Sequence, residues 1–485
     1  MNRRRPFSSS LCAGPARDTN AACNMFYSSF AEAVCLSIQE SNSQSRTRHI
    51  LSRFKSDWFH QLLRRQTFVR HVASTMSTQI VGLMLSVVAS VIVARTLGPQ
   101  GKGAVAVVLL IGNLLALVLN GGLSSANVYF AASGKISPSK LLSNSVIFAL
   151  LATLIGAVLV LVLASTGLIA KLVPGVSMGL LLVGIIAFPV RLLDLLLSCI
   201  LQGLQKIVTV NIIDLNQSLI YVVLVLILVV VFKGGVWGAV VALQSGVVVT
   251  AIAKLVVLNH QNIRLHLRWD GAVARETLRY GAKGYVSNIM QFFNYRLDSL
   301  IVNFYLGVAG TGLYSVSVSL AELLWHMPNA VSYSLFPKSA ASKVEHVNRV
   351  LPGIFGITTA VTALGAGALA LSGKFAIRLL FSRAFASAYT PMLALLPGVV
   401  CLGAGKVLLA YISGRGYPIY QSIAIGVSLV VTVALDFVLI PRYGILGAAI
   451  ASSVSYTTIL LFAAYFYFQV RDRVSGSAEP VKSAC

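Results

Sequence analysis

Charged side chains are scarce in this chain of 485 residues: they make up 11% of it, against 57% hydrophobic residues. Soluble globular proteins carry about 25% charged residues, so the composition excludes a soluble globular fold. Cysteine is also rare, and the six cysteines are scattered without a Cys-x-x-Cys pair. This spacing excludes a disulfide framework and a zinc site. Nothing in the pattern predicts a bound metal or a cofactor.

Long hydrophobic runs are what the sequence has in abundance. A run of about 20 apolar residues crosses a bilayer as a helix, which satisfies its own backbone hydrogen bonds there. We therefore predict an all-α polytopic membrane protein with about twelve transmembrane helices. They are expected to begin near Ser74, Ala104, Leu141, Ser177, Ile212, Val236, Gly284, Gly312, Val350, Tyr389, Ile419 and Ile445.

The few charges are unevenly split between the two signs. Thirty-eight Lys and Arg oppose 14 Asp and Glu, which gives a net charge of +24. In a soluble protein this excess would suggest nucleic acid as a partner. Here the positive-inside rule explains it, because placing both termini and the loop at residues 259–283 in the cytoplasm puts most Lys and Arg on that side. We expect them to contact anionic lipid head groups and no nucleic acid.

The chain is predicted to divide near its midpoint. Residues 1–69 are rich in Ser and Arg and poor in acids, which is typical of a disordered leader, an organellar transit peptide or a dispensable extension. Residues 70–258 and 284–468 are each expected to form a six-helix lobe. Residues 259–283 are expected to form an amphipathic cytoplasmic connector, and residues 469–485 a cytoplasmic tail.

An internal repeat supports two similar lobes. Residues 90–103 and 299–312 align without a gap and share the spacing Gly-x-x-Gly-x-Gly. Because each lobe has an even number of spans, both lobes enter the membrane in the same direction, so the predicted pseudo-two-fold repeat is parallel. Glycine adopts the positive φ angles that tight turns need. We therefore expect turns at Gly98, Gly101, Gly103, Gly307, Gly310 and Gly312.

Ionisable side chains inside the spans are candidates for function, because each costs about 2.5–3.5 kcal/mol at the centre of a membrane helix. Asp214, Lys254 and Asp436 lie near predicted helix ends, where they are expected to reach the interface as anchors. The remaining side chains lie deeper and need a partner or a water-filled cavity. They are Arg191, Asp194, Arg296, Asp298, Glu322, His326 and Lys406.

Spacing distinguishes two pairs among the deeper residues. Arg191 and Asp194 are three residues apart, so they share a helix face and can neutralise each other. A structural ion pair and a functional site are both consistent with that spacing. Arg296 and Asp298 point in different directions, so at least one of them must meet another helix or water.

The next predicted helix offers such a partner. Glu322 and His326 lie one turn apart on one face. A Glu beside a His can bind and release a proton or a cation near neutral pH. The same residues can instead form a structural network around Arg296, and the spacing alone does not decide between the two.

Several stretches resemble a known family. They are A-R-T-L-G-P-Q-G-K-G at residues 94–103, Y-R-L-D-S-L-I-V-N-F-Y-L-G-V-A-G-T-G-L-Y at 295–314, the segment 321–337 ending in L-F-P, and 414–452 with G-R-G-Y-P and L-I-P-R-Y-G-I-L-G-A-A-I-A-S. Together they resemble the Wzx-type polysaccharide-export flippases of the multidrug/oligosaccharidyl-lipid/polysaccharide exporter superfamily. The resemblance covers about residues 68–468.

This resemblance implies a two-lobed transporter of the bacterial cytoplasmic membrane and not an enzyme. Its expected substrate is a polyprenyl-pyrophosphate-linked oligosaccharide, moved by alternating access for surface polysaccharide synthesis, with a polysaccharide polymerase as the expected protein partner. Arg296 occupies the family's R-x-D position and is the first candidate to bind the substrate anion. Arg191 and Lys406 are assigned to the substrate by depth alone. The side chains expected to line the cavity or to couple a proton or sodium ion are Asp298, Glu322, His326 and Asp194.

Two other functions are weighed against the flippase. A drug/cation antiporter of the same superfamily should favour unpaired acids over Arg in its cavity. A membrane glycosyltransferase or polymerase should carry a large extramembrane loop with acids or metal ligands, whereas the largest outward loop, residues 372–388, contains no Asp or Glu. The motifs favour the flippase.

Overall fold

The computed structural model describes residues 66–167, 174–186, 188–341 and 344–476. Most of the predicted leader and the end of the predicted tail lie outside these residues. Contacts divide the chain into two units, Met1–Ala73 and Ser74–Cys485, and the second holds all of the described helices except the first residues of α3. Within the described residues all regular structure is helical, which confirms the predicted all-α class.

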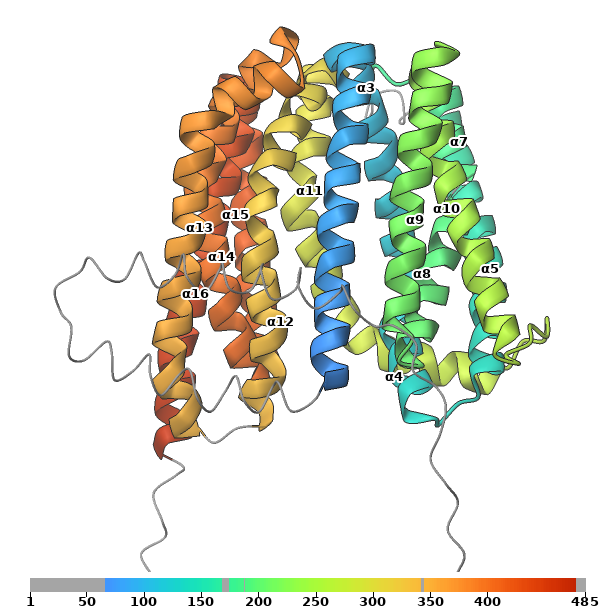
Figure 1. Ribbon diagram of the computed structural model, residues 1–485, viewed down its shortest axis with the longest axis vertical. Coiled ribbons are helices and arrows are strands. Elements are labelled where there is room, and N and C mark those ends of the chain that lie inside the picture. Colours follow the sequence, from blue (N-terminus) through green and yellow to red (C-terminus); the bar gives the residue numbers. More distant parts are fainter. Residues whose placement is uncertain (1–65, 168–173, 187, 342–343, 477–485) are drawn as a thin grey trace, which may run out of the picture. The chain divides into compact units, whose positions relative to one another are not determined.

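The first half of the larger unit is built from long apolar helices (Figure 1). α8 packs against α4, α5 and α10, and α9 packs against α10. Small and branched side chains such as Val93, Val107 and Ala239 form a fully buried core. The elements are α3 (Gln66–Asn120), α4 (Leu123–Ser133), α5 (Pro138–Ser165), α7 (Met178–Ile186), α8 (Phe188–Gly203), α9 (Ile207–Val225), the π-helix η1 (Leu226–Val231) and α10 (Gly235–His260).

The second half repeats this plan. α14 packs against α12, α13 and α16, and α15 packs against α11 and α16. Tyr314, Tyr411 and Val302 are fully buried in its core. The elements are α11 (Gly271–Glu322), the 3-10 helix η2 (Leu323–Trp325), α12 (His326–Ala341), α13 (Val344–Leu380), the 3-10 helix η3 (Arg383–Ala388), α14 (Tyr389–Gly414), α15 (Pro418–Tyr443) and α16 (Ile445–Gly476).

Two of the long helices are divided by a glycine kink, and each then counts as two membrane crossings. Ten helices of the described part are long and apolar enough to cross a membrane, and two of these, Ile80–Asn120 and Tyr285–Ala340, are far longer than one crossing needs. Each contains one non-helical residue: Gly98 with φ 65° and ψ −173°, and Gly307 with φ 66° and ψ −172°. Each kink separates two spans, so the prediction of about twelve crossings is confirmed.

The matching kinks confirm the parallel duplication, and a second match extends it. Gly235 and Gly444 are as far apart in sequence as Gly98 and Gly307. Both have positive φ, 58° and 60°, and both stand at the start of the last span of their half. The two halves therefore share one backbone plan from their first span to their last.

The prediction that all six motif glycines form turns is wrong for four of them. Only Gly98 and Gly307 have positive φ, whereas the other four lie within helix. Gly101 and Gly310 lie against the leucine one turn before them, Leu97 and Leu306. Gly103 and Gly312 lie at a close approach of two backbones, which also requires glycine but involves no turn.

The segment that joins the halves is held to the first half. Residues 261–270 have no regular secondary structure. Asp270 caps α11 by accepting a hydrogen bond from the backbone N–H of Val273. The amide of Asn144 donates to the Asp270 carbonyl at 2.9 Å and accepts from its N–H at 3.0 Å. Lys140 adds an ion pair of 2.9 Å to the Asp270 carboxylate.

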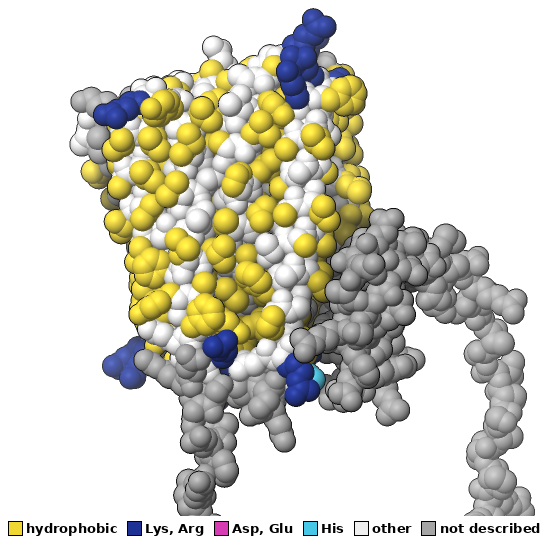
Figure 2. Space-filling view, turned by 90° about the vertical axis from the view of Figure 1, so that its left-hand side faces the viewer, with side chains coloured by type: hydrophobic (Ala, Val, Ile, Leu, Met, Phe, Trp, Pro, Cys, Tyr) yellow, Lys and Arg dark blue, Asp and Glu magenta, His cyan; other side chains and the backbone are white. Residues whose placement is uncertain are grey.

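The outer surface is that of a membrane protein. Figure 2 shows a face on which hydrophobic side chains cover the middle and Lys and Arg gather at the two ends. Large apolar side chains of α13 are exposed, with Leu371 89% and Leu364 73% accessible. Such exposure is stable only against lipid.

Candidate functional site

The kink at Gly307 folds α11 back on itself, so that Arg296 and Glu322 meet. Arg296 Nη1 lies 2.8 Å from Glu322 Oε1, and Nη2 lies 3.1 Å from Oε2. This two-pronged geometry is the strongest that a guanidinium and a carboxylate form. The expectation that a side chain of the following span would meet Arg296 is confirmed. The two charges neutralise each other within the second half.

Asp298, two residues on, meets hydroxyl groups. Its side chain accepts hydrogen bonds from the Tyr314 hydroxyl at 2.5 Å and from the Ser452 hydroxyl at 3.0 Å, and from the backbone N–H of Ser299 at 2.6 Å. The residue is 2% exposed. No Lys or Arg forms an ion pair with it among the described residues. A buried carboxylate is thus held by neutral donors.

A second buried carboxylate is Asp436 on α15, and sequence reasoning misplaced it. The prediction of an interfacial anchor is wrong, because Asp436 is 0% exposed. Neither of its carboxylate oxygens has a hydrogen-bond partner in the described part of the chain, and the buried hydroxyl of Thr432, one turn earlier, has none either. Asp436 lies close enough to Asp298 for the two carboxylates to repel each other when both are charged. Hydropathy predicts where Asp436 lies along its helix, but it does not predict in which direction its side chain points.

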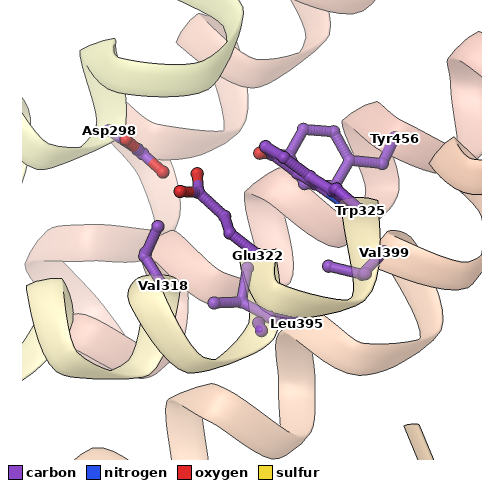
Figure 3. A pocket seen from close by; sticks show the side chains of 8 residues that line it. Asp298, Val318, Glu322, Trp325, Leu395, Val399 and Tyr456 are labelled. Atoms are coloured by element: carbon purple, nitrogen blue, oxygen red, sulfur yellow. The ribbon is translucent and has the colours of Figure 1, made fainter. Parts of the chain in front are cut away.

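A small cleft, with room for about one water molecule, opens beside Asp298 and Glu322. Figure 3 shows the carboxylates of Asp298 and Glu322 turned towards each other, with the rings of Trp325 and Tyr456 on one side. The remaining walls are apolar and come from α11 and α14. The cleft therefore combines acidic oxygens with aromatic and aliphatic walls, a set that suits a small cation or a proton-carrying water.

Lys406 on α14 lies beside the cleft and has no carboxylate partner among the described residues. Its ammonium donates to the side-chain oxygen of Asn329 at 2.9 Å. It also lies 4.5 Å from the ring centre of Trp325 and 5.4 Å from that of Tyr295, where aromatic faces attract a cation. The positive charge is held in place but not neutralised.

The remaining predicted residue of this half, His326, lies apart. It is exposed, and no ion pair or side-chain hydrogen bond joins it to Glu322 in the described residues. The predicted Glu and His pair does not form, because the 3-10 helix η2 intervenes between them. The carboxylate of Glu322 turns to Arg296 instead.

In the first half, Arg191 and Asp194 find separate partners. Arg191 Nη1 donates to the side-chain oxygen of Asn113 at 2.7 Å, whereas Asp194 accepts from Lys254 at 2.7 Å. Lys254 also pairs with Asp214 at 2.8 Å and is completely buried. The ion pair between Arg191 and Asp194 that their spacing allows does not form. The expected anchoring of Lys254 at the interface is wrong. Their spacing showed that Arg191 and Asp194 share a face of α8. It did not show that Lys254 of α10 would pair with Asp194.

A family model matches more than half of this chain. It is that of the polysaccharide biosynthesis proteins, matched over residues 68–342. The chain belongs to this family. No curated protein sequence matches it. The matched region contains both glycine kinks, both Arg candidates and the connector, so the predicted resemblance is confirmed for the family.

Comparison with solved structures shows that this chain has a known fold. A structure titled lipid II flippase MurJ, inward closed conformation, matches with a TM-score of 0.67 at 16% identity, covering 84% of this chain and 90% of the other. An inward-facing MATE family multidrug transporter of the MOP superfamily matches with a TM-score of 0.68 at 15% identity, covering 83% and 98%. Its outward-facing counterpart gives a TM-score of 0.58. The chain therefore has the fold shared by the MurJ flippase and the MATE transporters of the MOP superfamily.

Proposed function

We propose that this multi-pass membrane protein is a flippase of the bacterial cytoplasmic membrane. It moves a polyprenyl-pyrophosphate-linked oligosaccharide from the cytoplasmic to the outer leaflet, where a polysaccharide polymerase uses it. Family and fold support the proposal. Both termini and the connector lie in the cytoplasm, as the positive-inside rule requires. The two halves alternate in opening to either side, without covalent chemistry.

One observation carries this assignment: each half holds one deep cation on a neutral amide. In the first half the amide of Asn113 holds Arg191, and in the second the amide of Asn329 holds Lys406. Both cations come from the fourth span of their half. An unneutralised cation inside a membrane is costly, and the pyrophosphate of the substrate offsets that cost when it binds. We therefore assign the substrate anion to Arg191 and Lys406.

Arg296 takes a different role from the one its motif position implies. Its guanidinium is already occupied by both oxygens of Glu322. Binding a phosphate there would require breaking a bidentate pair. We assign to Arg296 the positioning of Glu322 at the cleft, and a contact with substrate only in states in which this pair opens.

The cleft itself is proposed to bind the coupling ion. Asp298 and Glu322 line the cleft. Asp436 lies near Asp298, Arg296 pairs with Glu322, and Lys406 lies against Trp325. These three acids outnumber the two bases by one. An uncompensated carboxylate in a membrane needs a proton or a cation. Asp298 and Asp436 supply oxygens without a basic partner, so we assign a proton or sodium ion to them. We assign no coupling ion to Asp194, because the ammonium of Lys254 already pairs with its carboxylate.

The test uses one substitution that adds a charge and one that does not. Asn329→Asp places a carboxylate against Lys406 and neutralises it, whereas Asn329→Gln keeps a neutral amide. In a strain that depends on this protein for surface polysaccharide, we expect Asn329→Asp and Lys406→Ala to lower polysaccharide at least about tenfold at unchanged protein level, which corresponds to about 1.4 kcal/mol. Asn329→Gln should retain most of it. Arg191→Ala should resemble Lys406→Ala.

A matched control is Lys374→Ala, which removes an exposed lysine of α13 that does not line the cleft. It should leave polysaccharide unchanged. Normal polysaccharide with both Arg191→Ala and Lys406→Ala would overturn the assignment. Exchange of a cationic drug for protons by proteoliposomes, without movement of lipid-linked sugar, would establish the antiporter instead.

A further inference from the structure

The two copies of the repeated motif contact each other directly. A Cβ atom on Gly103 would lie 2.9 Å from the backbone nitrogen of Gly312 and closer still to the carbonyl of Val308. A Cβ on Gly312 would lie 3.0 Å from the nitrogen of Gly103 and closer still to the carbonyl of Pro99. Pro99 and Val308 are matching positions of the repeat. The contact is therefore symmetric, and the pseudo-two-fold axis passes through it.

Glycine is required here by packing. Real Cβ atoms essentially never lie within 3.0 Å of another heavy atom, so any side chain would force the two backbones apart. Small residues let membrane helices approach closely enough for backbone contacts, including Cα–H···O contacts. Gly103 and Gly312 thus hold α3 against α11 (Figure 1). Both lie at the end of their spans opposite the connector, which we call the outer end.

An asymmetric polar contact closes the same end. Arg95 donates from Nε to the carbonyl of Leu380 at 2.7 Å, and from Nη2 to the carbonyl of Leu379. These carbonyls are the last of α13 and have no partner within their helix. The matching position in the second copy is Phe304, which cannot make this contact. We call Arg95 with the two carbonyls the latch. Beside it, Ala94 is buried in a cluster of residues from α11, α13, η3 and α14.

The other end of the same interface is built differently. There Gly122 and Gly281 also approach each other's backbone, and the Tyr285 hydroxyl donates to the carbonyl of Leu117 at 2.8 Å. The chain itself joins the halves at this end, through the segment that Asn144 holds at Asp270. The connector keeps the halves linked at this end whichever way they open, so the outer end can part more widely.

We propose that the Gly103 and Gly312 contact, with the latch, is a gate that closes the outer end and parts when the halves open outwards. Closure depends on a backbone approach that a single methyl group prevents. Opening frees the two carbonyls of α13 to bind water and exposes the cluster around Ala94. The proposal concerns which surfaces separate, and it holds for any transported molecule.

The experiment measures access to the closed interface in the full-length protein. A single reporter cysteine replaces Ala94, which is 1% exposed, in a variant whose own cysteines are changed to serine. The protein is reconstituted in lipid nanodiscs and labelled with a membrane-impermeant maleimide. In the glycine background labelling should be slow. Gly103→Ala should raise the rate about tenfold, because it favours the open state by about 1.4 kcal/mol. Gly312→Ala should do the same.

The matched control is Gly112→Ala on the same helix. A Cβ there would meet only the carbonyl of Gly184, at 3.8 Å, which is ordinary contact, so labelling should stay slow. Arg95→Gln removes the latch charge without adding a wedge and should raise labelling by a smaller factor. Size-exclusion profiles identify any variant that misfolds. Equal labelling of Gly112→Ala and the folded Gly103→Ala and Arg95→Gln variants would overturn the gate, and surface polysaccharide would still test the flippase separately.

Discussion

The two halves share a backbone plan and differ in how they treat buried acids. The kinks at Gly98 and Gly307 agree within a degree in both torsions. Yet in the first half Lys254 forms ion pairs with both Asp194 and Asp214, whereas the matching position in the second half is Ala463. There two carboxylates are left without a base. The comparison teaches that the two halves share their backbone geometry but not their charges, so the proposed ion site belongs to the second half alone.

The difference also separates structural from functional charge. A buried ion pair with both partners present contributes mainly to a defined fold. A buried carboxylate without a partner costs free energy in every state that leaves it charged. Such a group persists where binding an ion offsets the cost. In its buried acids, the first half therefore resembles a structural frame, and the second half resembles a site for the proposed coupling ion.

The largest effect should come from breaking the frame. Lys254→Met leaves Asp194 buried and unpaired, which should lower the free energy of unfolding by about 3–5 kcal/mol. The half-exposed Asp214 adds less, because water screens it. The loss is measured as a lower melting temperature of the purified protein in detergent.

A triple variant is the matched control for this prediction. Lys254→Met combined with Asp194→Asn and Asp214→Asn removes all three charges and should recover most of the stability. A Lys254→Met variant that melts with the wild type would show that the first half does not depend on this pair.

The corresponding change in the second half should act in the opposite direction. Asp436→Asn removes an unpartnered buried carboxylate, so stability should not fall. What should be lost is stabilisation by the coupling ion, which for an ion at ten times its Kd is about 1.4 kcal/mol. Melting temperatures in sodium and choline chloride, each at two pH values, measure it. A variant that keeps the ion or pH response of the wild type would remove Asp436 from the ion site.

Much of the fold could be predicted from the sequence, because lipid imposes a simple rule on length and hydropathy. The spans follow from it, and so does the expectation that Arg296 or Asp298 must meet another helix or water. The turn at Gly98 also follows, because only glycine accepts that φ readily.

The tertiary partners could not be predicted in the same way. Hydropathy placed Lys254 and Asp436 near helix ends but gave no direction for their side chains, and both are fully buried. Helical spacing showed that Arg191 and Asp194 share a face, yet each bonds to a residue of another helix. A spacing of three residues shows that two side chains are neighbours on one helix. It does not show whether a residue of another helix forms a stronger contact with either of them. The spacing of Gly103 and Gly312 likewise gave no sign that the two copies touch.

The smallest effect concerns the exposed ion pair of Lys140 and Asp270, which holds the connecting segment to the first half, in contrast to the buried pairs of Lys254. The hydrogen bond from Lys140 holds the pKa of Asp270 below its ordinary range, and the N–H of Val273 lowers it further. Because this pKa is lowered by folding, its stabilising effect is present above the ordinary carboxyl pKa of about 3.9 and is lost as the pH falls through the lowered value. Hydrogen exchange of residues 261–270, corrected for the intrinsic effect of pH, should therefore accelerate modestly in acid. Asp270→Asn keeps the helix cap but not the charge, so its exchange should be independent of pH over that range. An equal acid response in Asp270→Asn would assign the connector's attachment to the Asn144 hydrogen bonds alone.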